Sequence, residues 1–326
     1  MAKTRALEDL LAELHQMREA PATEAAVAKL KQALGSKMSH AVAKAAAITG
    51  EAELAALVPE LVAAFDRLMI NPVKADPGCA AKAAIADALY RIGCDDEAFF
   101  LRGIRHVQLE PVYGGKVDTA GPLRGACALG LVRMNYREVM NELADLLADP
   151  DPPVRLAAVR AIAYSENDQG APLLRLKVLT GDDEPQVISE SLQTLLKLAA
   201  ETSLAFVSRL LDAPATETRA AAALALGGSR LPEAFEILRS WWTRTISAEL
   251  RRTALLAIAM LRRDPSLDFL LSLVSDGNAL DARDAIAALG LYRHDDALRE
   301  RVADVVKRRR DVDLRKALAE AFEGGR

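Results

Sequence analysis

The sequence is poor in aromatic residues, cysteine and histidine. Phe, Trp and Tyr make up 4% of the 326 residues, and there are three cysteines and four histidines. Cores of β-sheets favour β-branched and aromatic side chains, so this composition argues against an all-β fold. Because Cys79, Cys94 and Cys127 are an odd and sparse set, they do not form a disulfide scaffold, and they predict a reducing compartment.

A strong excess of charge and a long uncharged segment are also missing. The 42 Lys and Arg residues nearly balance the 46 Asp and Glu residues, for a net charge of −4, which argues against a general nucleic-acid binder. The longest stretch without charged residues, Ala220–Ser229, is about half the length of a membrane-spanning helix. The first residues lack the uncharged core of a signal peptide. We therefore expect a cytoplasmic protein with no membrane partner.

What the sequence has in abundance is alanine and leucine. Ala occurs 62 times and Leu 49 times, which together are about a third of the chain. Both residues favour α-helix, and no segment alternates apolar and polar residues for long enough to indicate a strand. The sequence therefore predicts an all-α protein in which small side chains let helices approach closely.

An internal repeat organises the second half of the chain. Apolar anchor residues recur every 31 to 33 residues, and an Ala precedes nearly all of them. The anchors are Leu129, Ile162, Leu195, Leu226, Ile258, Leu289 and Phe322. Each anchor lies in an Ala-rich helix that is followed by a Leu-rich amphipathic helix, so each repeat reads as a helix pair. Pairs of this kind bury their apolar faces by stacking on their neighbours.

The segment DPPVRLAAVRAI, residues 151–162, resembles the HEAT repeat, in the short Ala-rich form of phycobilisome-lyase-like proteins. Arg155, Arg219 and Arg251 match the arginine at the start of the first helix, whereas Ile188 departs from it. The resemblance covers about residues 36–326. It implies a right-handed α–α superhelix, a HEAT/armadillo-like solenoid of about nine helical pairs, whose second helices line the concave face.

The ends of such a solenoid need polar caps. We expect residues 1–35 to supply N-terminal capping helices, around Ala6–Met17 and Ala25–Leu34, with the solenoid over residues 36–326. A C-terminal capping helix is expected at about residues 314–322.

The repeat pattern is interrupted once, by a long loop at about residues 103–121. Connections of this length are uncommon in compact repeats and are often functional. The candidate binding residues in and around the loop are Arg102, Arg105, His106, Glu110, Tyr113, Asp118 and Arg124. Two interpretations stay open: the loop is a recognition site, or it is a structural loop whose charges pair with one another.

Motifs for catalysis, metal binding and cofactors are not recognised. None of the four histidines is followed by Glu, so a resemblance to the iron hydroxylases built on this fold fails at the ligands. His106 and Glu110 alone are too few for a stable metal site. We predict no catalytic residue, no metal and no cofactor, and we lean against an enzyme. Cys79 and Cys127 are interpreted as small buried apolar residues.

Trp241 and Trp242 are further candidates for binding, because one of them could offer a stacking surface beside the cations of the second helices. The arginines at the helix starts are interpreted instead as a structural ladder between repeats.

The favoured function is a non-enzymatic scaffold that binds a protein or peptide partner, of unknown identity, through its concave surface and the 103–121 loop. One alternative is a nucleic-acid binder resembling the HEAT-repeat alkylpurine DNA glycosylases, which requires a basic concavity with an exposed Trp. The other is a cofactor-handling protein resembling the bilin lyases, which requires a closed pocket around His106, Tyr113 and Asp118.

Overall fold

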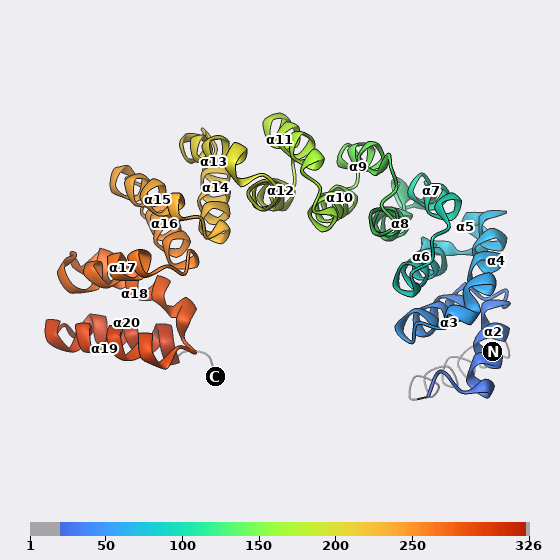
Figure 1. Ribbon diagram of the computed structural model, residues 1–326, viewed down its shortest axis with the longest axis horizontal. Helices are drawn as coiled ribbons and strands as arrows, with labels where there is room; N and C mark the ends of the chain where they lie inside the picture. Colours follow the sequence, from blue (N-terminus) through green and yellow to red (C-terminus); the bar gives the residue numbers. More distant parts are fainter. Residues whose placement is uncertain (1–19, 324–326) are drawn as a thin grey trace. The chain divides into compact units, whose positions relative to one another are not determined.

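The structure, a computed structural model, describes residues 20–323 and is drawn in Figure 1. The chain divides into two compact units, unit 1 (Met1–Asn167) and unit 2 (Asp168–Arg326). The described residues fold as an all-α HEAT-type solenoid, as the repeat pattern predicts. No helix within residues 20–323 is long and apolar enough to cross a membrane.

Unit 1 contains helices α2 to α10 and a pair of short strands. The helices are α2 (Glu24–Leu34), α3 (Ser39–Glu51), α4 (Val58–Met69), α5 (Pro72–Ala75), α6 (Ala80–Ile92), α7 (Glu97–Ile104), α8 (Gly121–Arg133), α9 (Val139–Leu147) and α10 (Pro152–Ser165). The strands are β1 (Leu109–Val112) and β2 (Gly115–Asp118).

Unit 2 contains helices α11 to α20. They are α11 (Ala171–Thr180), α12 (Pro185–Leu198), α13 (Ala200–Arg209), α14 (Thr216–Ser229), α15 (Pro232–Arg244), α16 (Ala248–Met260), α17 (Asp264–Asp276), α18 (Ala279–Leu289), α19 (Asp296–Arg309) and α20 (Val312–Glu323). The predicted N-terminal helix at Ala6–Met17 lies outside the described residues. Helices α2 and α20 occupy the other two predicted capping positions, and their capping role stays a prediction.

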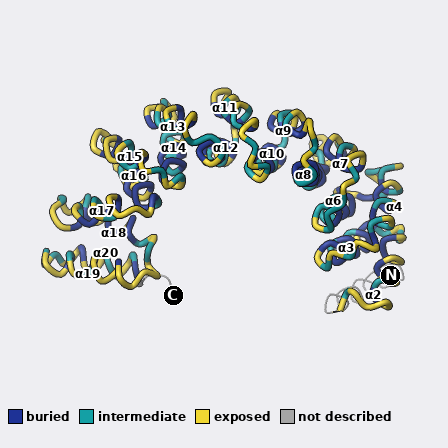
Figure 2. Tube along the Cα trace, in the orientation of Figure 1, coloured by how far each residue is buried: buried dark blue, intermediate teal, exposed yellow. Residues whose placement is uncertain are grey.

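Successive Ala-rich helices form the most closely packed row of each unit: α3, α6, α8 and α10 in unit 1, and α12, α14, α16, α18 and α20 in unit 2. The alanines before the anchors, such as Ala128 and Ala257, are fully buried between these helices. Backbones approach so closely that a Cβ on Gly50 would lie 2.6 Å from Cα of Ala88. Figure 2 shows the buried residues on the sides of the helices that face their neighbours.

The two rows are arranged opposite to the expectation from the family resemblance. Within each unit the Ala-rich helices lie on the inner side of the bend and the Leu-rich helices on the outer side, for example α8 and α10 inside α9 (Figure 1). The prediction that the second helices line the concave face is therefore wrong. The physical reason is side-chain size, because helices that meet through Ala and Gly pack at a shorter spacing than helices that meet through Leu.

The interruption of the repeat is a β-hairpin rather than an irregular loop. Strands β1 and β2 are antiparallel, from the pair Leu109↔Asp118 to the pair Val112↔Gly115. Tyr113 and Gly114 form the two-residue turn, and Gly114 has a φ of 90°, which suits glycine. Four residues per strand are too few for an alternating pattern to be read from sequence, which is why only the position of this element was predicted.

Candidate partner-binding surfaces

The hairpin of unit 1 exposes apolar side chains. Tyr113 at its tip is fully exposed, with a relative accessibility of 108%. The other exposed apolar residues of the segment are Val107, Leu109, Val112 and Val117. A two-stranded hairpin is at best marginally stable by itself, so this one needs anchors at its base.

Gln108 is the first anchor, and it is almost completely buried. Its backbone N–H donates to Oδ1 of Asp118 over 2.8 Å, which joins the start of the hairpin to its end. Its side-chain amide donates to the carbonyl oxygen of Asp76 over 2.8 Å and to Oε1 of Glu110 over 2.6 Å. Gln108 thereby ties the hairpin to the segment that precedes α6.

Glu110 is a second anchor. Its Oε1 accepts hydrogen bonds from the side chain of Gln108, from the backbone N–H of Gly78 (2.7 Å) and from Oγ1 of Thr119 (2.8 Å). These bonds, chiefly the one from Gln108, lower the pKa of Glu110. Glu110 is therefore a structural carboxylate in this arrangement.

Arg124 of α8 anchors the other side of the hairpin, and it is only 3% exposed. Its guanidinium donates to Oδ2 of Asp118 (2.6 Å) and to the carbonyl oxygen of His106 (3.0 Å), and it pairs with Asp149 at 3.0 Å. Burial raises the pKa of Asp118, but hydrogen bonds from Ala120, Gln108 and Arg124 outweigh burial, so the pKa lies below its ordinary value. Burial also lowers the pKa of His106, which favours the neutral imidazole.

Beneath the hairpin lies a charged pair that sequence reasoning missed. Lys82 of α6 is fully buried, and its Nζ lies 3.2 Å from Oδ2 of Asp76. Asp76 also accepts hydrogen bonds from the backbone N–H groups of Ala81 and Lys82. The sequence did contain a sign of this burial. Lys82 lies three residues before Ile85 and therefore on the same, buried face of α6.

The remaining charged candidates bind neighbouring repeats. Arg102 donates to Asp66 over 2.8 Å, and Arg105 forms a two-bond contact with Glu142. Arg124 pairs with Asp118 of the loop, whereas Arg102 and Arg105 pair with helices outside it. The choice between a structural loop and a recognition site stays a prediction. What the hairpin leaves unpartnered is its apolar tip.

The candidate cofactor trio does not converge. Tyr113 lies at the tip of the hairpin, whereas His106 and Asp118 lie at its base and bind Gln108 and Arg124. Cys79, beside this base, has its pKa raised to about 12 by burial, which disfavours a thiolate nucleophile. Cys79 and Cys127 are both buried, as predicted. Within residues 20–323, no three His, Cys, Asp or Glu side chains come close enough together to hold a metal ion.

Both tryptophans are buried, so neither offers a stacking surface. Trp241 is 2% exposed, and its indole N–H donates to the carbonyl oxygen of Leu211 over 2.9 Å. Trp242 is covered by the guanidinium of Arg251, 4.2 Å from the ring centre, and by the edge of Phe269. The expectation that one of the two is exposed is wrong, because consecutive residues of α15 here face α14 and α16 in turn.

The arginine ladder is formed in part. Arg251 pairs with Asp281 of the next repeat at 2.7 Å. Arg155 donates to the carbonyl oxygens of Asp149 and Pro150, whereas Arg219 donates to Thr216 of its own helix. These arginines serve structure, as the sequence indicated.

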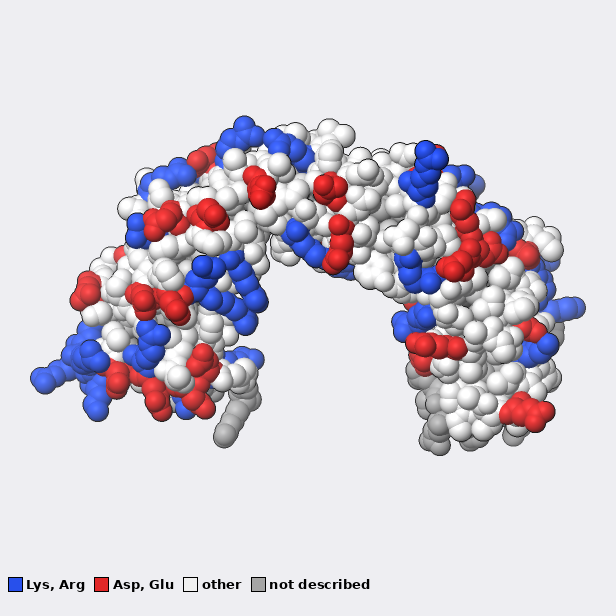
Figure 3. All heavy atoms as spheres, viewed as in Figure 1, with Lys and Arg blue, Asp and Glu red and all other residues white. Residues whose placement is uncertain are grey.

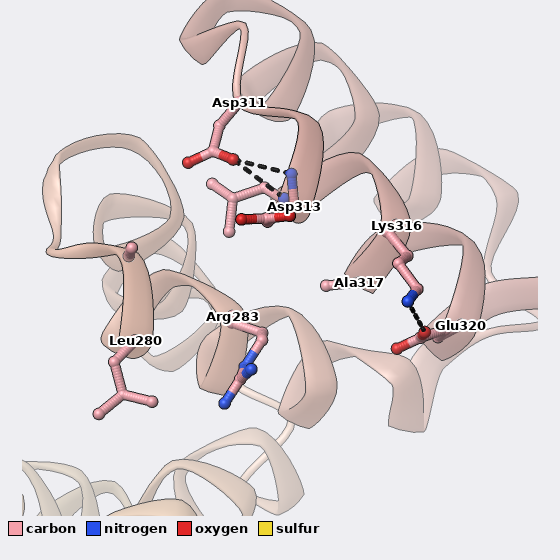
Figure 4. Close-up of a pocket in the computed structure, with 9 residues that line it drawn as sticks. Leu280, Arg283, Asp311, Asp313, Lys316, Ala317 and Glu320 are labelled. Carbon is pink, nitrogen blue, oxygen red and sulfur yellow. Dashed lines mark hydrogen bonds and ion pairs between the residues drawn. The ribbon is translucent and has the colours of Figure 1, made fainter.

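Shallow pockets lie between successive Ala-rich helices. In unit 1, a pocket of about 310 Å³ between α8 and α10 is lined by small and apolar residues that include Gly125, Leu129 and Ala157. In unit 2, a pocket of about 440 Å³ between α18 and α20 is lined by both apolar and charged residues, among them Arg283 and the Lys316–Glu320 pair (Figure 4). The inner row of helices therefore provides recesses of different chemistry in the two units.

Comparison with known proteins matches the chain to HEAT repeats over residues 117–195 and 173–259. No curated protein matches it. Among solved structures it is similar to the complex of CpcE and CpcF of phycocyanin lyase from Nostoc sp. PCC7120, at 18% identity and a TM-score of 0.37, over 74% of this chain and 92% of that chain. HEAT repeats are thus matched over residues 117–259, which is less than half of the chain.

Proposed function

We propose that the chain is a non-enzymatic scaffold that binds a protein partner, and that the hairpin of unit 1 is its docking element. The observation that carries the proposal is an exposed apolar hairpin fixed on a buried polar base. Exposed apolar groups that are held rigidly lose little conformational entropy on binding. A hairpin without such a role would gain nothing from five exposed apolar side chains.

The inner face of unit 1 supports the same proposal. Gly121 and Pro122 follow β2 directly and line the apolar pocket between α8 and α10. A partner that contacts the hairpin can therefore extend along the Ala-rich helices over a mostly apolar recess, in which Arg160 is the one charged lining residue. The partner chemistry that fits is an apolar patch or an exposed strand edge, since β1 and β2 each have one unpaired edge.

We further infer a reducing compartment such as the cytoplasm. The three cysteines are free, and burial raises the pKa of both Cys79 and Cys127. Thiols in this state are chemically inert and need no disulfide partner.

The experiment removes the apolar tip and keeps its base. The test variant is Val112→Ser, Tyr113→Ser and Val117→Ser. A matched control replaces three exposed apolar residues of unit 2, as Leu176→Ser, Leu179→Ser and Ile246→Ser. Each variant is used as bait in native lysate, and bound proteins are quantified by mass spectrometry beside circular dichroism of the baits.

We expect the tip variant to lose at least one protein by tenfold or more, while the control variant keeps it and both baits retain helical spectra. Identical bound proteins for all three baits would overturn the proposal. A hairpin-dependent dimer of the isolated chain in sedimentation would also overturn it, because the apolar tip would then be covered by a second copy.

A further inference from the structure

Three arginines occupy one equivalent position in successive repeats of unit 2. Arg230, Arg262 and Arg293 follow the Ala-rich helices α14, α16 and α18, each four residues after the anchor, at spacings of 32 and 31 residues. All three are exposed. Figure 3 shows Lys and Arg side chains gathered on one edge of this unit, beside α14 and α16.

Two of these arginines, Arg230 and Arg262, act on one side chain, Tyr292. The hydroxyl of Tyr292 donates to the carbonyl oxygen of Ala259 over 2.5 Å, so its ring spans two repeats. The guanidinium of Arg262 lies 5.9 Å from the centre of that ring. Burial raises the pKa of the Tyr292 hydroxyl, and the charges of Arg262 and Arg230 oppose that rise.

None of the three forms an ion pair within the described part of unit 2, and Arg293 hydrogen-bonds only to His294. Elsewhere in the unit, arginines find carboxylates at 2.6 to 2.8 Å, as in Arg244–Asp212, Arg251–Asp281 and Arg301–Asp268. Asp295, whose charge also acts on Tyr292, caps α19 by accepting from the backbone N–H of Leu298. The three arginines thus carry positive charge without an ion-pair partner among the described residues.

The backbone at two of these positions is left-handed. Arg230 and Arg262 have φ values of 56° and 54°, which glycine adopts without strain and which are disfavoured for a side chain with Cβ. The same conformation follows other helices of the chain, at Asn135, Glu166 and Arg310, so it is a feature of how these helices end and does not by itself point to a ligand.

We propose that Arg230, Arg262 and Arg293 form a binding site for an acidic peptide segment of a protein partner. The inference rests on the proposed function as a protein scaffold and adds a second contact with different chemistry. Carboxylates match the guanidinium fork in two-bond geometry. A nucleic acid fits less well, because the two tryptophans are buried and offer no surface on which a base could stack.

The spacing of the row suggests the peptide's pattern. Helices that pack through small residues lie about 8–9 Å apart, and a Cβ on Gly227 of α14 would lie 2.7 Å from Cα of Ala257 in α16. A polyproline II chain rises about 3.1 Å per residue with three residues per turn, so every third side chain shares a face at about 9 Å. Acidic residues at every third position would therefore meet successive arginines.

The test uses fluorescent peptides and the full chain. The probe is a Glu-Pro-Pro repeat, compared with a Gln-Pro-Pro repeat, a shuffled peptide of the same composition and a short single-stranded oligonucleotide. The protein variant is Arg230→Gln, Arg262→Gln and Arg293→Gln. Its matched control removes three exposed cations from the end of α19, as Lys307→Gln, Arg308→Gln and Arg310→Gln. Binding is measured by fluorescence anisotropy.

We expect the Glu-Pro-Pro peptide to bind at least tenfold more weakly to the cluster variant and within twofold of wild type to the control variant. The Gln-Pro-Pro peptide should not bind, and the shuffled peptide should bind more weakly than the regular one. Equal losses in both variants, or tighter binding of the oligonucleotide than of the acidic peptide, would overturn the proposal.

Two further variants separate effects on folding from effects on binding, and separate the arginine proposal from the hairpin proposal. Arg230→Gly with Arg262→Gly should weaken peptide binding while raising the melting temperature, so a loss of binding cannot be attributed to unfolding. The hairpin-tip variant should bind the acidic peptide like wild type. If it does so and yet keeps all its lysate partners, the hairpin proposal fails alone; if the cluster variant binds the peptide normally, the arginine proposal fails alone.

Discussion

One arginine of unit 1 and two arginines of unit 2 lie in opposite environments. In unit 1, Arg124 is buried and binds Asp118, Asp149 and the backbone of His106. In unit 2, Arg230 and Arg262 are exposed and form no ion pair with the described residues. One repeat architecture therefore uses the same residue type to fix an inserted element in one unit and to present charge in the other.

The largest expected effect concerns Arg124, the buried arginine of this comparison. Arg124→Ala should destabilise the chain by about 3–5 kcal/mol, because Asp118 and Asp149 would be left as partly buried charges without a partner. Urea denaturation followed by circular dichroism measures the loss. Arg262→Ala is the control from the other unit and should change stability by less than about 1 kcal/mol. Equal effects for the two variants would contradict the contrast.

The next effect tests the close packing of the Ala-rich row in unit 2. Gly227→Ala should cost about 1–3 kcal/mol, because the new Cβ would lie within 3 Å of the backbone of Ala257. Gly228→Ala is the matched control, since its Cβ would meet only Cε of Met260 at 3.8 Å. Helix propensity predicts that the control is neutral or stabilising. Thermal melts of both variants should therefore move in opposite directions.

Acid should weaken the base of the hairpin. The folded-state pKa values of Glu110 and Asp118 are lowered, so their stabilisation is present above the unfolded pKa and is lost as pH falls through the folded one. Hydrogen exchange of Gln108 and Thr119 amides should accelerate as pH falls below about 4, after correction for intrinsic rates. In Asp118→Asn that acid-induced acceleration should shrink, and an unchanged pH profile would contradict the role of this carboxylate.

The smallest expected effect on stability concerns Arg230, an exposed arginine of this comparison. Arg230→Gly should stabilise the chain by about 0.5–1 kcal/mol, because glycine relieves the positive φ without breaking an ion pair. Urea midpoints of the variant and wild type provide the measurement. Destabilisation would show that Arg230 has a structural role in the fold.

Much of the fold was predictable because the repeat fixes both helix period and contact face. The anchors from Ile162 to Leu289 and the alanines before them are buried, as the 31–33-residue pattern required, whereas Leu129 is partly exposed. The place of the inserted element was also visible as a break in that pattern. These features depend on local periodicity, which a single sequence displays directly.

Other features depend on comparison between rows or on tertiary contacts. The inner position of the Ala-rich helices follows from their shorter spacing relative to the Leu-rich row, which no single helix reveals. Trp242 was expected to compete with Trp241 for the core, yet Arg251 and Phe269 cover it from the next two helices. Arg230, Arg262 and Arg293 do recur at repeat spacing, but they follow the Ala-rich helices, whereas the sequence pattern pointed to the cations of the second helices.

Site-specific photo-cross-linking tests the central claim most directly. Tyr113 is replaced by a photoreactive phenylalanine derivative, and Ile246, equally exposed in unit 2, carries the same group in a parallel protein. A docking hairpin predicts a discrete protein adduct from position 113 that is missing from position 246. An adduct from position 246 with none from position 113 would contradict the hairpin as the site of partner binding.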